Sequence, residues 1–542
     1  MVKPYIEGNL RKSIMKSQAS DDLLLFNGGL NTYIEKAFID SNQLAYAMNV
    51  TVRQPPVLVS RAPRKTLADE IIGEGIPWSK NSNIALMWAY NEGNIYFVRE
   101  EGEKAYIEQL VRIGNKYDYE RLFEIQKAYN GNYYACYACK DNADYLYITT
   151  DTAKYRIDHI ERGMGIVTEL IDDHYGPAVF HKGRLFFAKP GTNVVEYSDY
   201  LNFDNFQYGY DEQTQVWYTA GSFPVNSHIG KLTALASFDD KLVIFCEHSM
   251  HVLYGEFATD EEDSTAQQVD LNNAVGTLKQ DFVAVGGGRM YWYGDDMQIY
   301  EYTGSYINMI SRPTEVSAGG IDTIFDRLTY PKKLSCSSNT LYINCNQRYL
   351  LTYDMYNRIW WCEDGGFATI ANYSQDIHNL IIATKEGDIL RTIESEVGEQ
   401  MNDTVYDWST NKSVTTPIQY EFHLRVYGAD GVSSRETLSK VHFQADADAE
   451  VFITDGWTMY DAWHPEKYGN SELANSRDVK IGTLKIHPSL HEIEKYNSQN
   501  YEQQECLVEK MFGQRLNTFQ VKVRGKGFAK FYIMKQDWRD AR

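Results

Sequence analysis

The chain has little of what membrane-spanning and disulfide-stabilised proteins need. No stretch approaches the roughly 18 consecutive apolar residues that a membrane helix requires, and the opening MVKPYIEGNLRKSIMKSQ has no apolar segment of the kind found in a signal peptide. Cysteines number only seven, at irregular spacing. An odd, irregular set is typical of reduced, mostly buried thiols. We therefore expect a chain that is made and folded in a cytoplasm.

Basic charge is also scarce. The sequence carries 53 Lys and Arg against 74 Asp and Glu, a formal charge of −21. Proteins that hold nucleic acid through its phosphates present a concentrated basic face. The composition therefore argues against a nucleic-acid ligand held in this way, whereas the sign suits a protein that lets DNA pass without gripping it.

A short pattern recurs seven times: an apolar strand, a tight polar turn and a second apolar strand. The second strands are centred on Ile95, Tyr145, Leu185, Leu242, Met290, Leu341 and Leu380. Paired strands recurring every 40 to 50 residues or so are typical of propeller blades, because one hairpin cannot bury its own apolar face. We predict an all-β fold with a six- or seven-bladed β-propeller. The number stays open because the first and seventh copies can close one blade together.

Three regions follow from where this pattern is found. Residues 1–60 lack it and form an N-terminal extension, residues 61–400 form the propeller, and residues 401–542 alternate like strands and form a β-sandwich-like C-terminal domain. In the extension, Gly28 and Gly29 offer positive φ values. DSNQLAYAMNV is typical of a capped helical turn that begins at Asp40 or Ser41.

Two motifs have the spacing of metal ligands. Cys136 and Cys139 form a CxxC pair, but no second pair accompanies them, so we interpret them as packing thiols on opposite faces of a strand. His487 and His491 lie four residues apart with Glu492 beside the second. Pro488 interrupts a helix there and no third ligand is evident, which favours loop histidines.

Three further motifs have a structural interpretation that outweighs the chemical one. Asp446, Asp448 and Glu450 alternate on one strand face, which favours a solvated face over a calcium site. Residues 286–288, Gly-Gly-Gly, predict a hairpin turn, because no Lys-Ser/Thr pair follows. VKVRGKGFAK, residues 521–530, predicts the charged face of an edge strand. We expect no catalytic residue, no metal and no cofactor.

Two segments resemble a known family. FNGGLNTYIEKAFIDSNQLAYAMNV, residues 26–50, resembles the opening of the tail nozzle proteins of short-tailed bacteriophages, also called phage stabilisation proteins. The matching positions are Phe26, Gly28, Gly29, Leu30, Asn31, Thr32, Asp40, Gln43, Asn49 and Val50. VVEYSDYLNFDNF is similar to a second element of that family. Its matching residues are Tyr197, Ser198, Asp199, Asn205 and Phe206.

The resemblance implies a structural protein and no enzyme. Nozzle proteins form a ring, usually of six copies, at the distal end of a podovirus tail tube, where it conducts and gates genome DNA during ejection. The implied partners are other copies of the chain, contacted through the N-terminal extension, the adaptor or portal-side ring, and tail fibre or spike proteins. Double-stranded DNA would pass without specific binding. The implied location is the virion tail, assembled in the bacterial host cytoplasm. We expect the acidic loop with Asp260, Glu261, Glu262 and Asp263 to face the channel.

Two other classes of function remain. A carbohydrate- or partner-binding propeller module fits the repeats, although repeated Trp-Asp dipeptides are missing and the Gly-Gly-Leu-Asn-Thr element would go unexplained. A propeller glycosidase fits less well, because the Ser-x-Asp-x-Gly-x-Thr-Trp box of sialidases is missing and the predicted inner strands carry few carboxylates.

Overall fold

The structure, a computed structural model, describes most of the chain from residue 23 to residue 540. The residues in that range that it leaves undescribed are 55–56, 74, 92, 142, 161–162, 164, 227, 260–263, 273, 314–318, 326–328, 347, 373–379, 394–400, 428–435, 456–462, 464–477, 486–503 and 508–518. The fold is nearly all β. Within the described residues, no helix is long and apolar enough to span a membrane.

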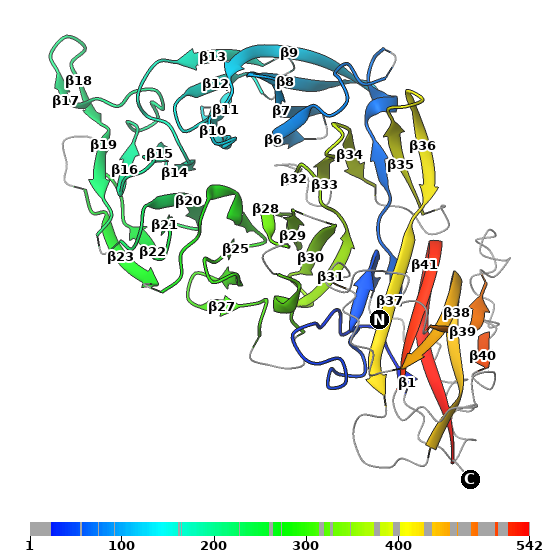
Figure 1. The fold of residues 1–542 in the computed structure, drawn as a ribbon. Coiled ribbons are helices and arrows are strands. Elements are labelled where there is room, and N and C mark those ends of the chain that lie inside the picture. The colour runs from blue at the N-terminus through cyan, green and yellow to red at the C-terminus, as the bar shows by residue number, and fades with distance from the viewer. Residues whose placement is uncertain are drawn as a thin grey trace.

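Seven antiparallel sheets surround a common axis as the blades of a propeller (Figure 1). Blade 1 comprises β6 (Asn83–Asn91), β7 (Asn94–Glu101), β8 (Lys104–Ile113) and β9 (Lys116–Gln126). Blade 2 comprises β10 (Tyr134–Lys140), β11 (Ala143–Thr149), β12 (Lys154–Asp158) and β13 (Ile166–Leu170). Blade 3 comprises β14 (Ala178–His181), β15 (Arg184–Ala188), β16 (Val194–Tyr197) and β19 (Gly221–Pro224). A separate hairpin, β17 (Tyr208–Asp211) and β18 (Val216–Thr219), is inserted before β19.

The next three blades keep the same order of strands. Blade 4 comprises β20 (Leu232–Phe238), β21 (Lys241–Cys246), β22 (Met250–Tyr254) and β23 (Gln267–Asn272). Blade 5 follows the 3-10 turn η2 (Gln280–Phe282) and comprises β24 (Val283–Gly286), β25 (Arg289–Tyr293), β26 (Ile299–Tyr302) and β27 (Ile307–Met309). Blade 6 comprises β28 (Pro331–Cys336), β29 (Thr340–Cys345), β30 (Tyr349–Asp354) and β31 (Ile359–Asp364). Further 3-10 turns are η1 (Ala68–Glu70) and η4 (Asp322–Ile324).

All seven predicted hairpins form the first two strands of a blade, which confirms the propeller. The first strands contact one another around the axis, so they are the innermost strands. At the predicted glycine turn, Gly286 pairs with Arg289, and Gly287 and Gly288 have φ values of +59° and +69°. Two successive positive φ values are what a two-residue type I′ hairpin turn requires.

Blade 7 closes the ring with a strand from the other end of the chain. It joins β32 (Thr369–Asn372), β33 (Leu380–Ala383) and β34 (Ile389–Thr392) to β5 (Arg64–Thr66). Asp388 fixes the closure: it accepts hydrogen bonds from Thr66 Oγ1 at 2.6 Å and from the Tyr406 amide at 2.9 Å. Burial raises the pKa of Asp388 to about 6, although these donors favour the carboxylate.

Two strands beyond blade 7 continue its sheet. They are β35 (Asn402–Asp407), which runs parallel to β5, and β36 (Lys412–Pro417). The sequence predicts these residues at the start of the C-terminal domain. In the structure they widen blade 7, and the second domain begins with β37.

A nine-stranded sheet forms the second domain, and both ends of the chain contribute to it. From the N-terminal side come β1 (Leu23–Leu24), β2 (Tyr46–Met48), β3 (Val50–Gln54) and β4 (Val57–Ser60). From the C-terminal side come β37 (Gln419–Tyr427), β38 (Glu436–Asp455), β39 (Val479–Leu484), β40 (Gln504–Leu507) and β41 (Phe519–Asp540). The region expected as an extension is therefore paired within this sheet from residue 23 onward: β2 pairs with β37, and β1 and β4 pair with β41.

Two local predictions about this domain are wrong. Strand β41 is central, because it lies between β37 and β38, so residues 521–530 are not an edge strand. Lys522 is 4% exposed there, and Asp478 compensates its charge at 3.0 Å. The predicted helical turn at Asp40 is a single hydrogen-bonded turn from the Gln43 amide to the Asp40 carbonyl, after which the chain enters strand β2.

Candidate functional site

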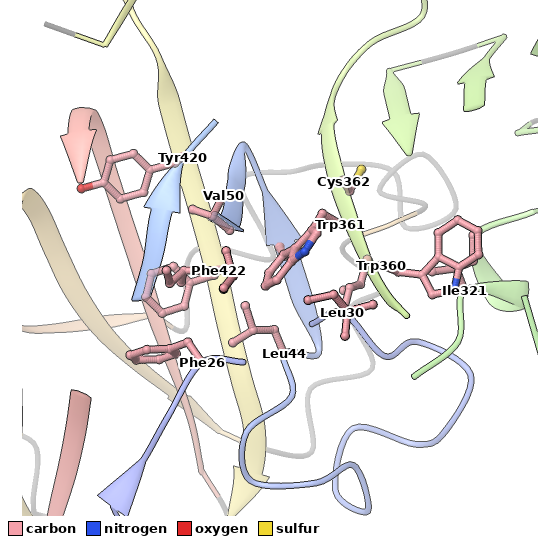
Figure 2. Packing of buried hydrophobic residues seen from close by; sticks show 14 of the residues in the cluster. Phe26, Leu30, Leu44, Val50, Ile321, Trp360, Trp361, Cys362, Tyr420 and Phe422 are labelled. Carbon is pink, nitrogen blue, oxygen red and sulfur yellow. The ribbon is translucent and has the colours of Figure 1, made fainter. Parts of the chain in front are cut away.

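The N-terminal motif lies where blades 5 and 6 pack against the nine-stranded sheet (Figure 2). Phe26 is 1% exposed and meets the rings of Phe422 and Phe531 edge-on, with centroids 5.7 and 6.4 Å apart. Leu30 and Trp360 are buried in the same cluster, which combines propeller and sheet residues in one hydrophobic core. We call this contact the joint.

Two glycines let the motif approach blade 6 closely. Gly29 has a φ of +69°, and a Cβ there would lie 2.8 Å from Ile359 Cβ. A Cβ on Gly28 would lie 2.7 Å from the Asn42 carbonyl oxygen. The next amide, that of Leu30, donates to the Trp360 carbonyl at 2.9 Å. The close approach therefore places the motif backbone against the outer strand of the blade.

The polar members of the motif hold its loop in shape. Gln43 Oε1 accepts from Asn31 Nδ2 at 2.9 Å and from the Asp40 amide at 3.1 Å. The Thr32 amide donates to the Gly320 carbonyl at 2.8 Å. Asn31 and Gln43 are each 1% exposed, so these bonds satisfy polar groups that water cannot reach.

Asn49 connects three segments that are far apart in sequence. Its Oδ1 accepts from Arg61 Nε and from the Asp364 amide, both at 2.9 Å, and its Nδ2 donates to the Gln419 carbonyl at 2.7 Å. Its φ of +59° is a left-handed conformation that asparagine tolerates better than most residues. One side chain thus joins the strands after β2 to the end of blade 6 and the start of β37.

Arg61 adds a buried ion pair across the same place. Its guanidinium is 1% exposed and donates to both oxygens of Asp403, at 2.9 and 2.5 Å, and also to Asp364. Burial opposes the charge of Arg61, but the hydrogen bond to Asp403 and the surrounding carboxylates raise its pKa above the usual value. The pair is fork-to-fork, the geometry that makes arginine–carboxylate contacts strong.

A cleft of about 880 Å³ opens beside Arg61, between the widened blade 7 and the nine-stranded sheet. Five carboxylates line it: Asp364, Asp403, Glu421, Asp448 and Glu450. Three cations also line it: Arg61, Arg524 and Lys526. Arg61 and Arg524 are held in ion pairs with residues of the cleft wall. The arrangement is a polar interdomain cleft whose charges are largely matched internally.

Glu421 on strand β37 is the most strongly perturbed acid of this cleft. It accepts from His423 Nε2 at 2.6 Å and from Arg524 Nε at 2.9 Å. Burial opposes its charge, but these two donors outweigh burial and lower its pKa to about 2. Burial lowers the pKa of His423, with Glu421 acting in the opposite direction. Glu421 therefore holds His423 and Arg524 in one hydrogen-bonded cluster within the sheet.

The second motif element holds the β17–β18 hairpin onto blade 3. Ser198 Oγ accepts from the Leu185 amide at 3.0 Å, and Asp199 Oδ1 accepts from the amide and hydroxyl of Thr219 at 2.8 and 2.9 Å. Arg184, 2% exposed, donates to the Ser198 and Thr219 carbonyls. Tyr197 packs on Phe257 with ring centroids 4.5 Å apart. These residues serve structure, and they lie on a different blade from the joint.

The structure places the remaining predicted residues as follows. Cys136 is 5% exposed, and Cys139, on the opposite face of β10, is exposed. Asp448 and Glu450 are exposed as predicted for a solvated face, but Asp446 is 2% exposed, so that prediction is wrong for Asp446. A β-bulge between Ala447 and Ala449 interrupts the alternation.

The other predicted residues lie outside the described residues: His487, His491, Glu492, Asp260, Glu261, Glu262 and Asp263. The described part of the chain contains no group of three metal-ligating side chains.

One arrangement that resembles a catalytic triad was not predicted from the sequence. On strand β22 and its neighbours, Ser249 Oγ lies 3.0 Å from His251 Nε2, and His251 Nδ1 lies 2.9 Å from Asp270 Oδ1. This is the connectivity of a Ser-His-Asp triad. Ser249 and His251 are both 0% exposed, and Ser249 Oγ already accepts from the Ile229 amide at 3.0 Å. A substrate carbonyl cannot reach that hydroxyl, so the triad acts as a structural hydrogen-bond chain.

Comparison with known proteins gives little beyond the fold. No family model matches the chain, and no curated protein matches it. Among solved structures it is similar to BamB from Moraxella catarrhalis, at 7% identity and a TM-score of 0.32, over 62% of this chain and 98% of that one. It is also similar to apo AztD from Citrobacter koseri, at 10% identity and a TM-score of 0.33, over 65% of this chain and 94% of that one. Both are β-propeller proteins. At these TM-scores neither similarity carries a functional argument, and the propeller assignment rests on the strand topology.

Proposed function

We propose that the protein is a structural component of a bacteriophage tail, the subunit of a distal nozzle ring that conducts and gates genome DNA. The observation that carries the proposal is the joint. The residues that resemble the opening of nozzle proteins, from Phe26 to Asn49, are gathered in one place, where they fix a propeller to a second β-domain. A motif that fixes two domains to each other has a structural role, as expected for a rigid subunit in the wall of a tail tube.

Composition supports the same proposal. A ring that surrounds double-stranded DNA works best without a basic lining, because each Lys or Arg on a phosphate releases counterions and holds the duplex. The formal charge of −21 has the required sign. A head-to-tail ring of identical subunits uses two different surfaces on each subunit, and the two-domain shape in Figure 1 offers a propeller and a sheet at opposite ends of the molecule.

The test is to omit the protein from phage assembly. Particles made without it should retain filled heads only briefly and should show tails without a distal ring, as measured by encapsidated DNA and by electron microscopy. Supplying the wild-type chain in trans should restore both. Particles that keep their DNA and a normal tail tip in its absence would refute the proposal.

A partner-binding propeller module is the second candidate, favoured by the β17–β18 hairpin. Figure 1 shows this hairpin projecting from the side of the propeller away from the nine-stranded sheet. Tyr208 is 77% exposed and Tyr210 is 55% exposed, and Trp217 lies between them across the hairpin, with ring centroids 6.5 and 6.3 Å away. Exposed Tyr and Trp are typical anchors of binding surfaces. Loss of partner or glycan binding on replacement of Tyr208 and Tyr210 by Ser, with the ring intact, would favour this candidate.

A further inference from the structure

The β17–β18 hairpin carries three aromatic rings on one of its faces. Tyr210 is paired with Trp217 across the two strands, so their side chains lie on the same side of the ribbon. Tyr208 comes two residues before Tyr210 and shares that side, because side chains alternate along a strand. Both tyrosines are exposed, and Trp217 is half-buried between them. We call these three rings the aromatic face.

The rings form a platform with a raised border. Trp217 and Tyr210 are inclined to each other by only 33°, with centroids 6.3 Å apart, so they offer a nearly continuous surface. Tyr208 stands at 75° to Trp217 and borders that surface on the other side. Figure 1 shows the hairpin projecting from the propeller, and within the described residues its two strands pair only with each other. The exposed rings are therefore accessible to a ligand.

Hydrogen bonds hold the hairpin in this shape before any ligand binds. At the turn, Asp211 Oδ1 accepts from the Gln213 amide at 2.9 Å, and Asp211 Oδ2 accepts from Thr214 Oγ1 at 2.8 Å. At the base, Asp199 binds the amide and hydroxyl of Thr219, as described above. A ligand meets rings that are already in place, which lowers the entropic cost of binding.

The charges around the aromatic face do not suit an anionic ligand. Residues 190–230 contain no Lys or Arg, and the turn adds the carboxylates of Asp211 and Glu212. Arg184 lies under the base of the hairpin, where it is 2% exposed and donates to Thr219. Aromatic rings that bind nucleic acid are accompanied by cations that contact the phosphates. The aromatic face therefore does not have the surroundings of a nucleic-acid site.

Two other kinds of partner fit the aromatic face less well. An aromatic cage for a quaternary ammonium group surrounds the cation with ring faces, whereas these three rings lie on one face of a two-stranded ribbon. A stable protein interface uses about 20–30 residues on each side. The hairpin covers only residues 208–219, which is too few for such an interface.

A neutral sugar chain matches the remaining features. A pyranose ring presents C–H groups that pack on an aromatic ring, while its hydroxyls donate and accept hydrogen bonds at the edge. The turn beside the aromatic face exposes Glu212, Gln213 and Gln215, whose carboxylate and amide groups supply both acceptors and donors. The two neighbouring rings of Trp217 and Tyr210 offer stacking surface to more than one sugar unit.

We propose that Tyr208, Tyr210 and Trp217 form a binding site for a neutral oligosaccharide or polysaccharide chain. Sugar rings stack on Trp217 and Tyr210, Tyr208 borders the bound chain, and the polar turn contacts its hydroxyls. The proposal rests on the second candidate function above, in which the hairpin binds a partner, and it names the chemistry of that partner. Binding is measured on the purified protein and the tail function on assembled phage, so either can fail alone.

The experiment is a screen of the full-length protein on an array of neutral and anionic glycans, followed by calorimetric titration with the neutral glycan that binds best. We expect saturable binding to at least one neutral glycan. Trp217→Ala and Tyr210→Ser should weaken that binding by about tenfold or more. Tyr210→Phe keeps the ring and should stay within about threefold of wild type. Tyr356→Ser, which removes an 89% exposed tyrosine from the β30–β31 turn, is the matched control and should bind like wild type.

Several results would overturn the proposal. They are the absence of saturable binding to every neutral glycan on the array, binding to anionic glycans alone, and equal affinity of wild type, Trp217→Ala and Tyr210→Ser. Binding of choline that is lost in Glu212→Gln, without binding of a neutral glycan, would assign the aromatic face to a cation instead. Loss of self-association in Tyr208→Ser, measured by sedimentation, with glycan binding unchanged, would assign it to a contact between copies of the chain.

Discussion

Replacement of Gly29 by alanine tests how tightly the joint is packed. The substitution lowers the free energy of unfolding for two reasons that can be measured separately. The first is the left-handed backbone at φ +69°, which costs a non-glycine residue about 1–2 kcal/mol. The second is the new methyl group, which would lie 2.8 Å from Ile359 Cβ and 3.1 Å from the Trp360 carbonyl oxygen. Forcing a methyl into a packed core costs about 1–3 kcal/mol more. We expect Gly29→Ala to destabilise the protein by about 2–5 kcal/mol in total.

Gly102 provides the matched control. It has a φ of +62°, and a Cβ there would meet nothing within 4 Å. Gly102→Ala should therefore cost only the backbone part, about 1–2 kcal/mol. The assay is urea unfolding followed by tryptophan fluorescence, since Trp360 and Trp361 lie in the joint. Equal destabilisation by the two substitutions would refute the claim that the motif is packed tightly against blade 6.

Three further predictions concern the ring closure, the joint and the thiols. The folded pKa of Asp388 lies near 6, above its unfolded value of 3.8. This carboxyl should therefore add stability below about pH 4 and lose about 3 kcal/mol as pH rises through 6. Denaturant unfolding at several pH values should show this slope, and Asp388→Asn should remove it. Asn49→Gly keeps the left-handed backbone but removes three hydrogen bonds, so unfolding measurements should show a loss of about 2–4 kcal/mol, and a loss below about 0.5 kcal/mol would contradict the role of the side chain. Burial raises the pKa of the Cys136 thiol to about 12. A thiol reagent should therefore label exposed Cys139 in the native protein and reach Cys136 only on unfolding; labelling of Cys136 in the native protein, located by peptide mapping, would argue against this.

The propeller was predictable because its signal is local. Each hairpin pairs residues a few positions apart, so strand alternation and turn residues are visible in one short window. The Gly28–Gly29 pair was likewise recognisable as a place where the backbone has an unusual conformation. Only Gly29 has a positive φ, however, and Gly28 is needed because Asn42 leaves no space for a Cβ.

The long-range pairings were not predictable. Strand β5 closes blade 7 by pairing Thr66 with Leu390, and β2 joins β37 by pairing Ala47 with Phe422. Nothing near Thr66 or Ala47 in the sequence indicates a partner more than 300 residues away. The N-terminal segment therefore looked like an extension.

The charged positions were misjudged for a related reason. Lys522 and its neighbours alternate like the solvent face of an edge strand, and only the distant Asp478 makes a buried lysine acceptable.

A cryo-electron microscopy reconstruction of the intact virion would decide whether the chain builds the distal ring of a phage tail. We expect a closed ring of six copies at the tip of the tail tube. Each subunit should fit a seven-bladed propeller joined to a nine-stranded sheet, with an acidic surface facing the channel. A tail tip without this fold, or a ring whose channel surface is basic, would contradict it.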